Sequence, residues 1–475
     1  METISPFLKK GSCVYLVGIK GTGVSAFAEL LHEAGVKVLG SDTEEVFYTD
    51  SILKELGIPY YESFDAGHIS GDIDLVIHSP AYNEKTNPEL AEALRKAIPV
   101  LSYPQALGLY SADFNSCGIT GVHGKTTTTA MCGTLMQGLG LQAQILAGSA
   151  VCDFGGKSTL TLGKKFFIAE TCEYRKNFLF FHPRRIVLTS VESDHQDFFH
   201  DYKSIRDAFA EYCRLLPDGG ELIYCADDPG ASEVAGIIAA EERGIVLIPY
   251  GFSASGDYRL SSYRVGNGRA FFRINALDEE LALFIPGRHQ ALNAAAAIAL
   301  SLTLLKDCNE THQAEIKKAL EEFRGSKRRS EIIGKANDII FMDDYGHHPT
   351  AIKSTLEGIK NFYPSRRLVV SFMSHTYTRT AALLKEFADS LKDADLLFLH
   401  KIYASPREKH DGKTDGKSIY NEVLKIKNKD VYYTDEPLDA FDPLMKLLKP
   451  GDIFLTLGAG NNWPLGVKLY EQSLI

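Results

Sequence analysis

The chain has 475 residues, enough for about three domains of ordinary size, and its composition of 45% hydrophobic and 24% charged residues is typical of a globular protein. The net charge of −10 disfavours a nucleic-acid polymer as partner, and no apolar stretch approaches the ~20 residues that cross a membrane. The chain starts without the basic and apolar regions of a signal peptide, and its eight scattered cysteines form no C-x-x-C pair. We therefore expect a cytoplasmic protein with reduced thiols and no membrane partner.

The first third of the chain predicts a small α/β domain. A buried strand is expected at 13–17, a glycine turn at 18–23, a helix with one apolar face at 24–34 and a second strand at 36–40. Another short strand is expected at 74–78. Strands that alternate with helices in this way are typical of a doubly wound parallel sheet.

The glycine turn reads G-x-x-G-x-G, whereas the dinucleotide-binding pattern is G-x-G-x-x-G. Because the turn opens a helix, it predicts a phosphate-bearing ligand at the helix N-terminus. Asp42, which follows the second strand, would accept a hydrogen bond from a ribose hydroxyl. A tight strand-to-helix turn without a ligand is the competing interpretation.

The most informative segment is 120–129, which reads T-G-V-H-G-K-T-T-T-T. Gly121 and Gly124 allow backbone amides to close around an anion, Lys125 adds a positive charge, and Thr126 supplies a hydroxyl that can bind Mg²⁺. The helix that follows presents its positive dipole end to the same anion. The pattern T-G-x-x-G-K-T differs from the usual phosphate loop in the position of its first glycine. Together these features predict a nucleotide triphosphate site.

The rest of the chain again alternates strands with helices. Strands expected at 166–169 and 186–189 are each followed by acidic residues, which is where phosphate-site enzymes hold Mg²⁺. A hairpin is expected at 261–274, around Gly266-Asn267-Gly268, and a long helix at 291–305. The last third has strands expected at 338–342, 367–372, 396–399 and 453–457.

In these motifs the chain resembles the Mur ligases of peptidoglycan synthesis. The matching segments are 121–129, 192–195, 287–294, 325–329, 343–350 and 375–380. The resemblance covers nearly the whole chain and implies an α/β fold of three domains. These would be a Rossmann-like UDP-sugar-binding domain at 1–113, a central P-loop ATP-binding domain at 114–323 and a Rossmann-like amino-acid-binding domain at 324–475.

The resemblance implies an ATP-dependent ligase that uses Mg²⁺ and joins L-alanine to the lactyl carboxylate of UDP-N-acetylmuramate. The carboxylate is first phosphorylated by ATP, and the amine of alanine then attacks the acyl phosphate. There are two alternatives. One is another Mur ligase, which adds a tripeptide or a later residue to the same nucleotide, and the other is a nucleotide-binding regulator without catalysis. The oligomeric state stays open.

The resemblance also assigns residues to each ligand. ATP would be bound by Gly121, Val122, His123, Gly124, Lys125, Thr126, Thr127, Gln290, Asn293, Arg329 and Asp344, and Mg²⁺ by Thr126, Glu170 and His195. The UDP-sugar would be bound by Gly18, Gly21, Thr22, Gly23, Asp42, His78 and Ser79. Catalysis would involve Lys125, Glu170, His195, Arg329, Asp344, His347, His348, His375 and Arg379, the last pairing with the alanine carboxylate.

Four positions depart from the family pattern. Cys172 stands where an aspartate is usual, Gln290 replaces an asparagine, Thr376 replaces a common arginine, and Asn461 lies where an acid often follows. The last two touch the amino-acid side, so they bear on how strictly alanine is selected.

Overall fold

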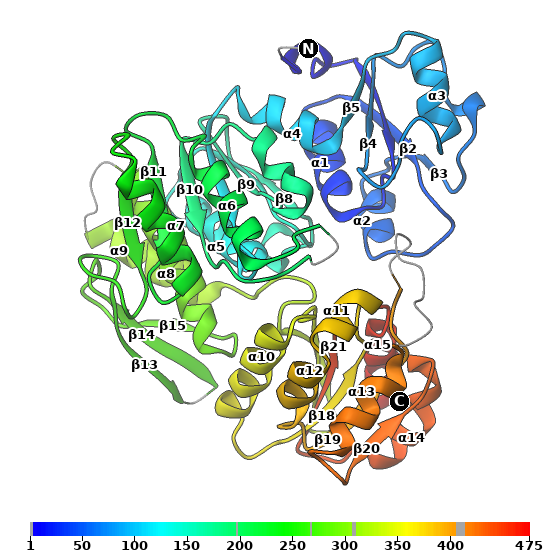
Figure 1. Cartoon of the computed structure of the whole chain (residues 1–475), viewed down its shortest axis with the longest axis vertical. Coiled ribbons are helices and arrows are strands. Elements are labelled where there is room, and N and C mark those ends of the chain that lie inside the picture. Colours follow the sequence, from blue (N-terminus) through cyan, green and yellow to red (C-terminus); the bar gives the residue numbers. More distant parts are fainter. Residues whose placement is uncertain (1–2, 196–197, 267, 306–309, 405–413) are drawn as a thin grey trace. The chain divides into compact units, whose positions relative to one another are not determined.

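The computed structural model describes residues 3–195, 198–266, 268–305, 310–404 and 414–475 (Figure 1). It divides into two compact units. One comprises Met1–Glu192, Tyr202–Arg259 and Asn293–Leu320, and the other comprises Ser193–Asp201, Leu260–Leu292 and Glu321–Ile475. Asn267 and Cys308 lie outside the described residues. Within the described ranges, no helix is both long and apolar enough to span a bilayer.

The first unit begins with a parallel sheet of five strands in the order β3-β2-β1-β4-β5. The strands are β1 (Cys13–Val17), β2 (Lys37–Ser41), β3 (Tyr60–Tyr61), β4 (Leu75–His78) and β5 (Val100–Ser102). The strand order reverses between β1 and β4, which pair with Val17 opposite His78. Ligands of doubly wound sheets bind at such a switch point, beyond the carboxyl ends of the strands.

The same unit contains a second sheet of seven strands in the order β12-β11-β10-β6-β9-β7-β8. They are β6 (Asn115–Thr120), β7 (Ala143–Leu146), β8 (Thr159–Thr161), β9 (Phe166–Glu170), β10 (Arg185–Leu188), β11 (Glu221–Cys225) and β12 (Val246–Tyr250). All neighbouring pairs are parallel except β7 and β8. β6 lies between β9 and β10, so the phosphate loop after β6 is flanked by the ends of those two strands.

The second unit holds a small antiparallel sheet of β13 (Leu260–Gly266), β14 (Arg269–Ile274) and β15 (Leu281–Leu283), which confirms the predicted hairpin. Its main sheet has the order β16-β17-β21-β18-β19-β20. These strands are β16 (Glu331–Ala336), β17 (Ile339–Asp344), β18 (Arg367–Phe372), β19 (Leu396–Leu399), β20 (Val431–Tyr433) and β21 (Asp452–Leu457). β16 alone runs antiparallel, and the sequence analysis missed it because its exposure does not alternate regularly.

Helices connect the strands in both units (Figure 1). In the first unit they include α1 (Thr22–Glu33), α2 (Thr49–Glu55), α3 (Pro88–Arg95), α4 (Tyr103–Ser111), α5 (Lys125–Gly138), α6 (Tyr202–Cys213) and α7 (Pro229–Ala240). Two helices extend across unit boundaries, α8 (Arg288–Leu304) and α9 (Glu310–Glu322). The second unit also has α10 (Pro349–Phe362), α11 (Tyr377–Ala382), α12 (Leu384–Leu391), α13 (Gly416–Leu424), α14 (Phe441–Leu447) and α15 (Trp463–Ser473).

Strand β18 shows how the core is built in the second unit. Leu368 and Val370 belong to a cluster with Ile352 of α10, whereas Val369 belongs to another cluster with Leu469 of α15. Successive side chains of a strand point to opposite faces of the sheet, so a continuous apolar run is needed when helices cover both faces. The sheet is therefore buried on both sides, and the edge formed by the strand ends is left for ligands.

Candidate active site

The phosphate loop connects β6 to α5 in the first unit. Gly121 and Gly124 have φ of +134° and +82°, which L side chains rarely adopt, and Gly124 is the N-cap of α5. The sequence-based prediction of a helix directly after the loop is confirmed. Its first turn contains Lys125, Thr126 and Thr127, so backbone amides and a helix dipole face the position expected for phosphate.

The residues that directly follow strand β10 are hydrogen-bonded to this loop. The Val122 amide donates to the Ser190 carbonyl (3.1 Å), the His123 amide donates to Ser190 Oγ (2.9 Å), and Thr189 Oγ1 donates to the Thr120 carbonyl (3.0 Å). A Cβ at Gly121 would lie 2.2 Å from Thr189 Oγ1, so only glycine fits here. We call Thr189–Glu192 the loop clamp; sequence reasoning missed the roles of Thr189 and Ser190.

The last residue of the loop clamp pairs with a side chain of the loop. Glu192 and His123 form an ion pair through Oε1 and Nε2, and both side chains are about one quarter exposed. Asp228, the N-cap of α7, accepts a hydrogen bond from the Val191 amide (3.0 Å) and so supports the loop clamp from the other side. The imidazole of His123 is therefore oriented by an acid.

Lys125 is held by a carboxylate. Its Nζ lies 3.0 and 3.1 Å from the two carboxylate oxygens of Glu173 and also donates to the Gly121 carbonyl. Burial alone would lower the pKa of Lys125, but the carboxylates of Glu173 and Glu170 outweigh burial and raise it. The ammonium is fully charged near neutral pH and lies at the mouth of the loop.

The geometry around Glu170 fits a divalent cation. Thr126 Oγ1 donates to Glu170 Oε2 at 2.8 Å, which brings a hydroxyl and a carboxylate oxygen together at the end of β9. A Cβ at Gly148 would lie 2.2 Å from Glu170 Oε2, so the absence of a side chain there makes room for the carboxylate. Hard oxygen ligands of this kind are those that Mg²⁺ prefers. The predicted third ligand, His195, belongs to the second unit and has φ of +53°.

Asn293 of α8 contacts the loop helix within the first unit. Its Oδ1 lies 3.4 Å from Thr128 Oγ1 and 2.6 Å from the position a Cβ would take at Gly124. Gln290, three residues earlier, belongs to the second unit and is buried, with its amide nitrogen 3.1 Å from His289 Nε2. Of the two α8 residues predicted to bind nucleotide, Asn293 therefore lies beside the phosphate loop within the first unit.

The predicted UDP-sugar residues meet at the switch point of the first sheet. Gly18 follows β1, and Ser79, which follows β4, donates its amide to the Val17 carbonyl (2.8 Å). His78 Nδ1 lies 2.9 Å from the Ser79 carbonyl. Gly21 and Thr22, at the start of α1, are exposed.

Asp42 is placed at the same sheet edge, but its carboxylate is largely occupied. It accepts the Lys20 amide at 2.7 Å and the Thr43 amide at 2.8 Å, and Tyr82 Oη is 3.4 Å away. Only 5% of Asp42 is exposed. The contacts therefore make Asp42 a residue that fixes the glycine turn, a role that the sequence pattern did not indicate.

In the second unit, the predicted site residues of β17 and of neighbouring loops also contact nearby residues of the protein. Asp344 Oδ2 accepts the Ser330 amide (2.7 Å), and Oδ1 accepts the Gly346 amide (2.7 Å). The Arg329 guanidinium lies over the Tyr345 ring, 5.2 Å from its centre. Asp344 thus ties two polar loops together at the carboxyl end of the sheet.

A buried ion pair joins the segment after the loop clamp to α11. Arg379 donates from Nη2 (2.6 Å) and Nε (3.2 Å) to Asp194 Oδ1, and each side chain is at most 6% exposed. Burial would raise the pKa of Asp194, but Arg379 dominates and holds it far below its usual range. Arg379, predicted to bind a substrate carboxylate, therefore contacts a carboxylate of the protein itself.

Three predicted histidines lie in loops at the same sheet edge. Burial, reinforced by Arg379, lowers the pKa of His347 well below its usual value, and its Nδ1 is 3.0 Å from the Tyr345 carbonyl. His348 is buried at the N-cap of α10, and His375 stacks on Tyr403 with 5.9 Å between ring centres. His347 is consequently neutral near pH 7.

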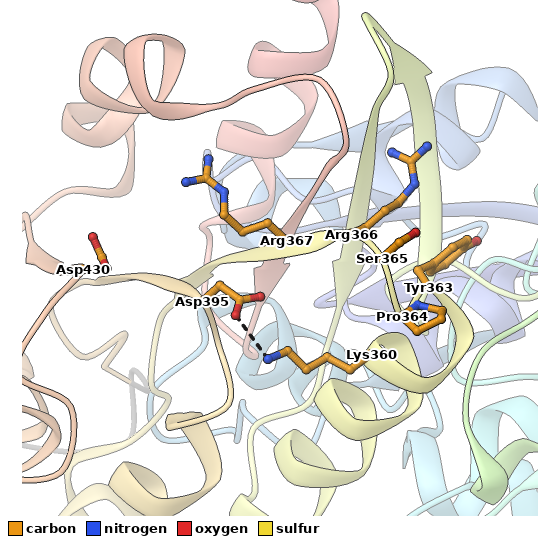
Figure 2. Close-up of a pocket in the computed structure, with 8 residues that line it drawn as sticks. All are labelled: Lys360, Tyr363, Pro364, Ser365, Arg366, Arg367, Asp395 and Asp430. Carbon is orange, nitrogen blue, oxygen red and sulfur yellow. Dashed lines mark hydrogen bonds and ion pairs between the residues drawn. The ribbon is translucent and has the colours of Figure 1, made fainter.

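A cavity in the second unit lies at the opposite edge of its sheet, near the amino ends of β18, β19 and β20 (Figure 2). Its cations are paired: Lys360 with Asp395 (3.3 Å), Arg366 with Asp338 (2.6 Å) and Arg367 with Asp452 (2.7 Å). None of the residues lining this cavity was predicted as a site residue. It is therefore separate from the strand ends described above.

Comparison with known proteins assigns the chain to a family. Three family models match it in order along the chain. They are the Mur ligase family catalytic domain at residues 14–115, the Mur ligase middle domain at 119–301 and the Mur ligase glutamate ligase domain at 328–460. The chain belongs to the Mur ligase family.

Members of this family with curated names are similar over nearly the full length. UDP-N-acetylmuramate–L-alanine ligase of Treponema pallidum is 49% identical over 97% of this chain and 96% of its own. The enzyme of the same name from Borreliella burgdorferi is 39% identical over 95% of this chain and 97% of its own. The sequence-based assignment to the Mur ligases is confirmed.

Solved structures agree with the fold. The UDP-N-acetylmuramate–alanine ligase of Thermotoga maritima has a TM-score of 0.79 at 26% identity and covers 97% of this chain and 99% of its own. A murein peptide ligase from Psychrobacter arcticus has a TM-score of 0.71 at 23% identity and covers 97% of this chain and 98% of its own. The predicted three-domain Mur ligase architecture, with parallel α/β sheets, is confirmed.

Proposed function

We propose that this protein is the Mur ligase that joins L-alanine to UDP-N-acetylmuramate at the expense of ATP in peptidoglycan synthesis. The observation that carries the proposal is 49% identity, over nearly the whole of both chains, to a relative named for this activity. The intact phosphate loop, with Lys125, Thr126 and Glu170 in contact with one another or with neighbouring acids, supports an ATP-consuming enzyme.

The chemistry follows from the poor reactivity of a carboxylate. A lactyl carboxylate oxygen attacks the γ-phosphorus of ATP, which forms an acyl phosphate and releases ADP. The uncharged amine of alanine then attacks the acyl carbon and gives up a proton to water as the amide bond forms, and inorganic phosphate leaves with the bonding electron pair. Both steps concentrate negative charge on phosphoryl oxygens, so positioned cations and backbone amides lower the barriers.

We assign most of the ATP-side roles to residues of the first unit. Gly121 to Thr127 cradle the phosphates, with Lys125 contacting the transferred phosphoryl group and Asn293 contributing beside the loop. Thr126 and Glu170, with His195, would hold Mg²⁺, which when bound neutralises phosphate charge. Because Lys125 is paired with Glu173 in this structure, ATP has to compete with that carboxylate for the ammonium.

We assign the remaining roles by the same reasoning. Gly18, Gly21, Thr22, Gly23, Asp42, His78 and Ser79 would surround the UDP group, and Gln290, Arg329 and Asp344 would complete the ATP site. His347, His348, His375 and Arg379 would position the lactyl carboxylate and alanine. Asp194 orients Arg379 for this purpose. The domain boundaries near residues 113 and 323 are part of the proposal, and the three family matches, which leave gaps at 116–118 and 302–327, support them.

The alternatives have less support. Likeness to the murein peptide ligase, at 23% identity, concerns the fold alone. A regulator without catalysis would not need Lys125, Thr126 and Glu170 together, yet all three are present at the loop.

The test is phosphate release by the purified protein with ATP, Mg²⁺ and UDP-N-acetylmuramate. L-alanine, glycine, L-serine and a tripeptide are supplied in turn, and the product is identified by mass. We expect release that depends on L-alanine. Release with the tripeptide alone would reassign the protein to a recycling ligase, and no release with any acceptor would refute the proposal.

The Lys125→Ala variant tests the phosphate-loop assignment separately. It should abolish phosphate release, because the loop loses the ammonium that we assign to the transferred phosphoryl group, while binding of UDP-N-acetylmuramate is retained. A matched control is Lys203→Ala on α6, since Lys203 is an exposed lysine whose ion pair is with Asp207. Full activity of the Lys125→Ala variant would contradict the assignment.

A further inference from the structure

A buried lysine lies inside the glycine turn of the first sheet. Lys20 is the third residue of Gly18–Gly23, and only 1% of its surface is exposed. Lysine side chains are almost never fully buried without a partner, because removing an ammonium from water is costly. The position therefore has a specific role.

The Lys20 ammonium has a complete set of acceptors. Nζ lies 3.1 Å from Asp50 Oδ1 and 3.0 Å from Glu62 Oε1, and it donates to the carbonyls of Thr43 (2.9 Å) and Glu45 (3.1 Å). The ammonium ties the segment after β2, the start of α2 and the end of β3 to the glycine turn.

The backbone of Lys20 is equally engaged. Its amide donates to Asp42 Oδ2 at 2.7 Å, and its carbonyl accepts from Thr49 Oγ1 at 2.6 Å. Asp50 is itself held by Tyr60 Oη (2.5 Å) and the Phe47 amide (2.7 Å). Both the side chain and the backbone of Lys20 therefore help to fix the turn before α1.

The charges of this cluster also matter for an anionic ligand. Asp42, Asp50 and Glu62 place three carboxylates close to the turn. The Lys20 ammonium contacts Asp50 and Glu62, and the Lys20 backbone amide donates to Asp42. Without the ammonium, uncompensated negative charge would lie near the position expected for a diphosphate. Like charges in a weakly screened site repel, so the ligand would bind less tightly.

We propose that Lys20 is a positioning residue for the uridine diphosphate group, which it never touches: it fixes the amides of Gly21–Gly23 and neutralises the carboxylates behind them. This inference rests on the proposed function, because it takes the glycine turn as the diphosphate site.

The test compares Lys20→Met with the wild-type enzyme. UDP and UDP-N-acetylmuramate binding are measured by calorimetry, and KM values are measured for both substrates. We expect Kd and KM for the uridine ligands to rise by about tenfold or more, with KM for ATP unchanged, because charge-assisted hydrogen bonds are lost beside only one of the sites. Lys20→Arg, which keeps the charge, should recover part of the affinity.

Lys37→Met is the matched control, since Lys37 lies in the same sheet with an exposed ion pair to Asp72 (3.0 Å), and it should leave all constants unchanged. If Lys20→Met does not fold, Thr49→Val is used, because it removes the hydrogen bond to the Lys20 carbonyl (2.6 Å) without changing any charge; a rise of about threefold in Kd for UDP is then expected. Equal affinities of folded variants and wild type for UDP would overturn the inference. Failure of the proposed function would look different, since the wild type would bind UDP but form no alanyl product.

Discussion

The buried carboxyl of Glu29 leads to a prediction about stability. Glu29 lies on α1, has no exposed surface, and accepts hydrogen bonds from the Ser158 amide (3.0 Å) and Thr159 Oγ1 (2.9 Å) beside β8. Burial raises the pKa of Glu29 from 4.5 to about 7, although both hydrogen bonds oppose the rise. The charged group that acts on it is Glu33, on the same helix, and Glu33 is itself paired with Lys157 at 3.1 Å.

The size of the effect follows from this shift. A carboxyl whose pKa is higher in the folded state binds more protons there than in the unfolded chain. Stability is therefore highest below the unfolded pKa, falls as pH rises from about 4.5 to about 7, and is constant above that. At 1.36 kcal/mol per pKa unit, the ionised, buried Glu29 lowers the free energy of unfolding by about 3 kcal/mol at pH 8.

Replacing Glu29 by glutamine removes this titration and keeps an oxygen that accepts the same hydrogen bonds. Urea unfolding of wild type and variant at pH 5 and pH 8 measures the difference. Relative to wild type, Glu29→Gln should gain about 2 to 3 kcal/mol between pH 5 and pH 8. Its absolute stability should vary less with pH.

Glu33→Gln is the control on the same helix, because Glu33 is one quarter exposed and contacts the same strand through Thr161 (2.8 Å). It should change the difference between pH 5 and pH 8 only slightly, because the Glu33 charge is the smallest of the causes that act on the Glu29 pKa. A Glu29→Gln variant whose stability changes with pH as steeply as that of wild type would refute the reasoning.

Three further predictions concern the site. Gly148→Ala should displace Glu170, whose Oε2 would lie 2.2 Å from the new Cβ, and lower kcat by about tenfold or more, which steady-state kinetics would measure. Thr126→Ala removes the hydroxyl beside Glu170, so a titration of activity should show a higher Mg²⁺ requirement; an unchanged requirement would contradict its role as a ligand. Arg379→Met removes the arginine partner of the buried Asp194 carboxylate and should reduce the free energy of unfolding in urea by about 3 kcal/mol, whereas the double variant Asp194→Asn with Arg379→Met should recover part of it.

The strands were predicted well where both faces are buried. Arg367–Phe372 and Leu396–Leu399 have the predicted bounds, because each is an apolar run flanked by polar residues. The helix at 24–34 begins earlier, at Thr22, since a helix N-terminus formed by glycines carries no capping side chain to mark it. β16 is half-exposed and has a register irregularity between Ile332 and Gly334, so no simple periodicity indicates it.

The site was predicted as a set of motifs, but not as a set of contacts. The phosphate loop is local in sequence, so Lys125 and Thr126 could be assigned from it alone. Their partners Glu173 and Glu170 lie 48 and 44 residues away, and the pairing depends on β9 lying beside β6. Asp42 fitted the pattern of a ribose-binding acid, and only the three-dimensional contacts revealed that the amide of Lys20 occupies it.

The loop clamp has a consequence for how nucleotide is recognised. Ser190 and Thr189 fix the amides and carbonyls of residues 120–123 through hydrogen bonds within the protein itself. The shape of the phosphate cradle is therefore determined when the chain folds, and binding does not have to order it. Discrimination between nucleotides should then depend on groups outside the cradle, such as Asn293, and the cradle itself should accept any nucleoside triphosphate with similar geometry.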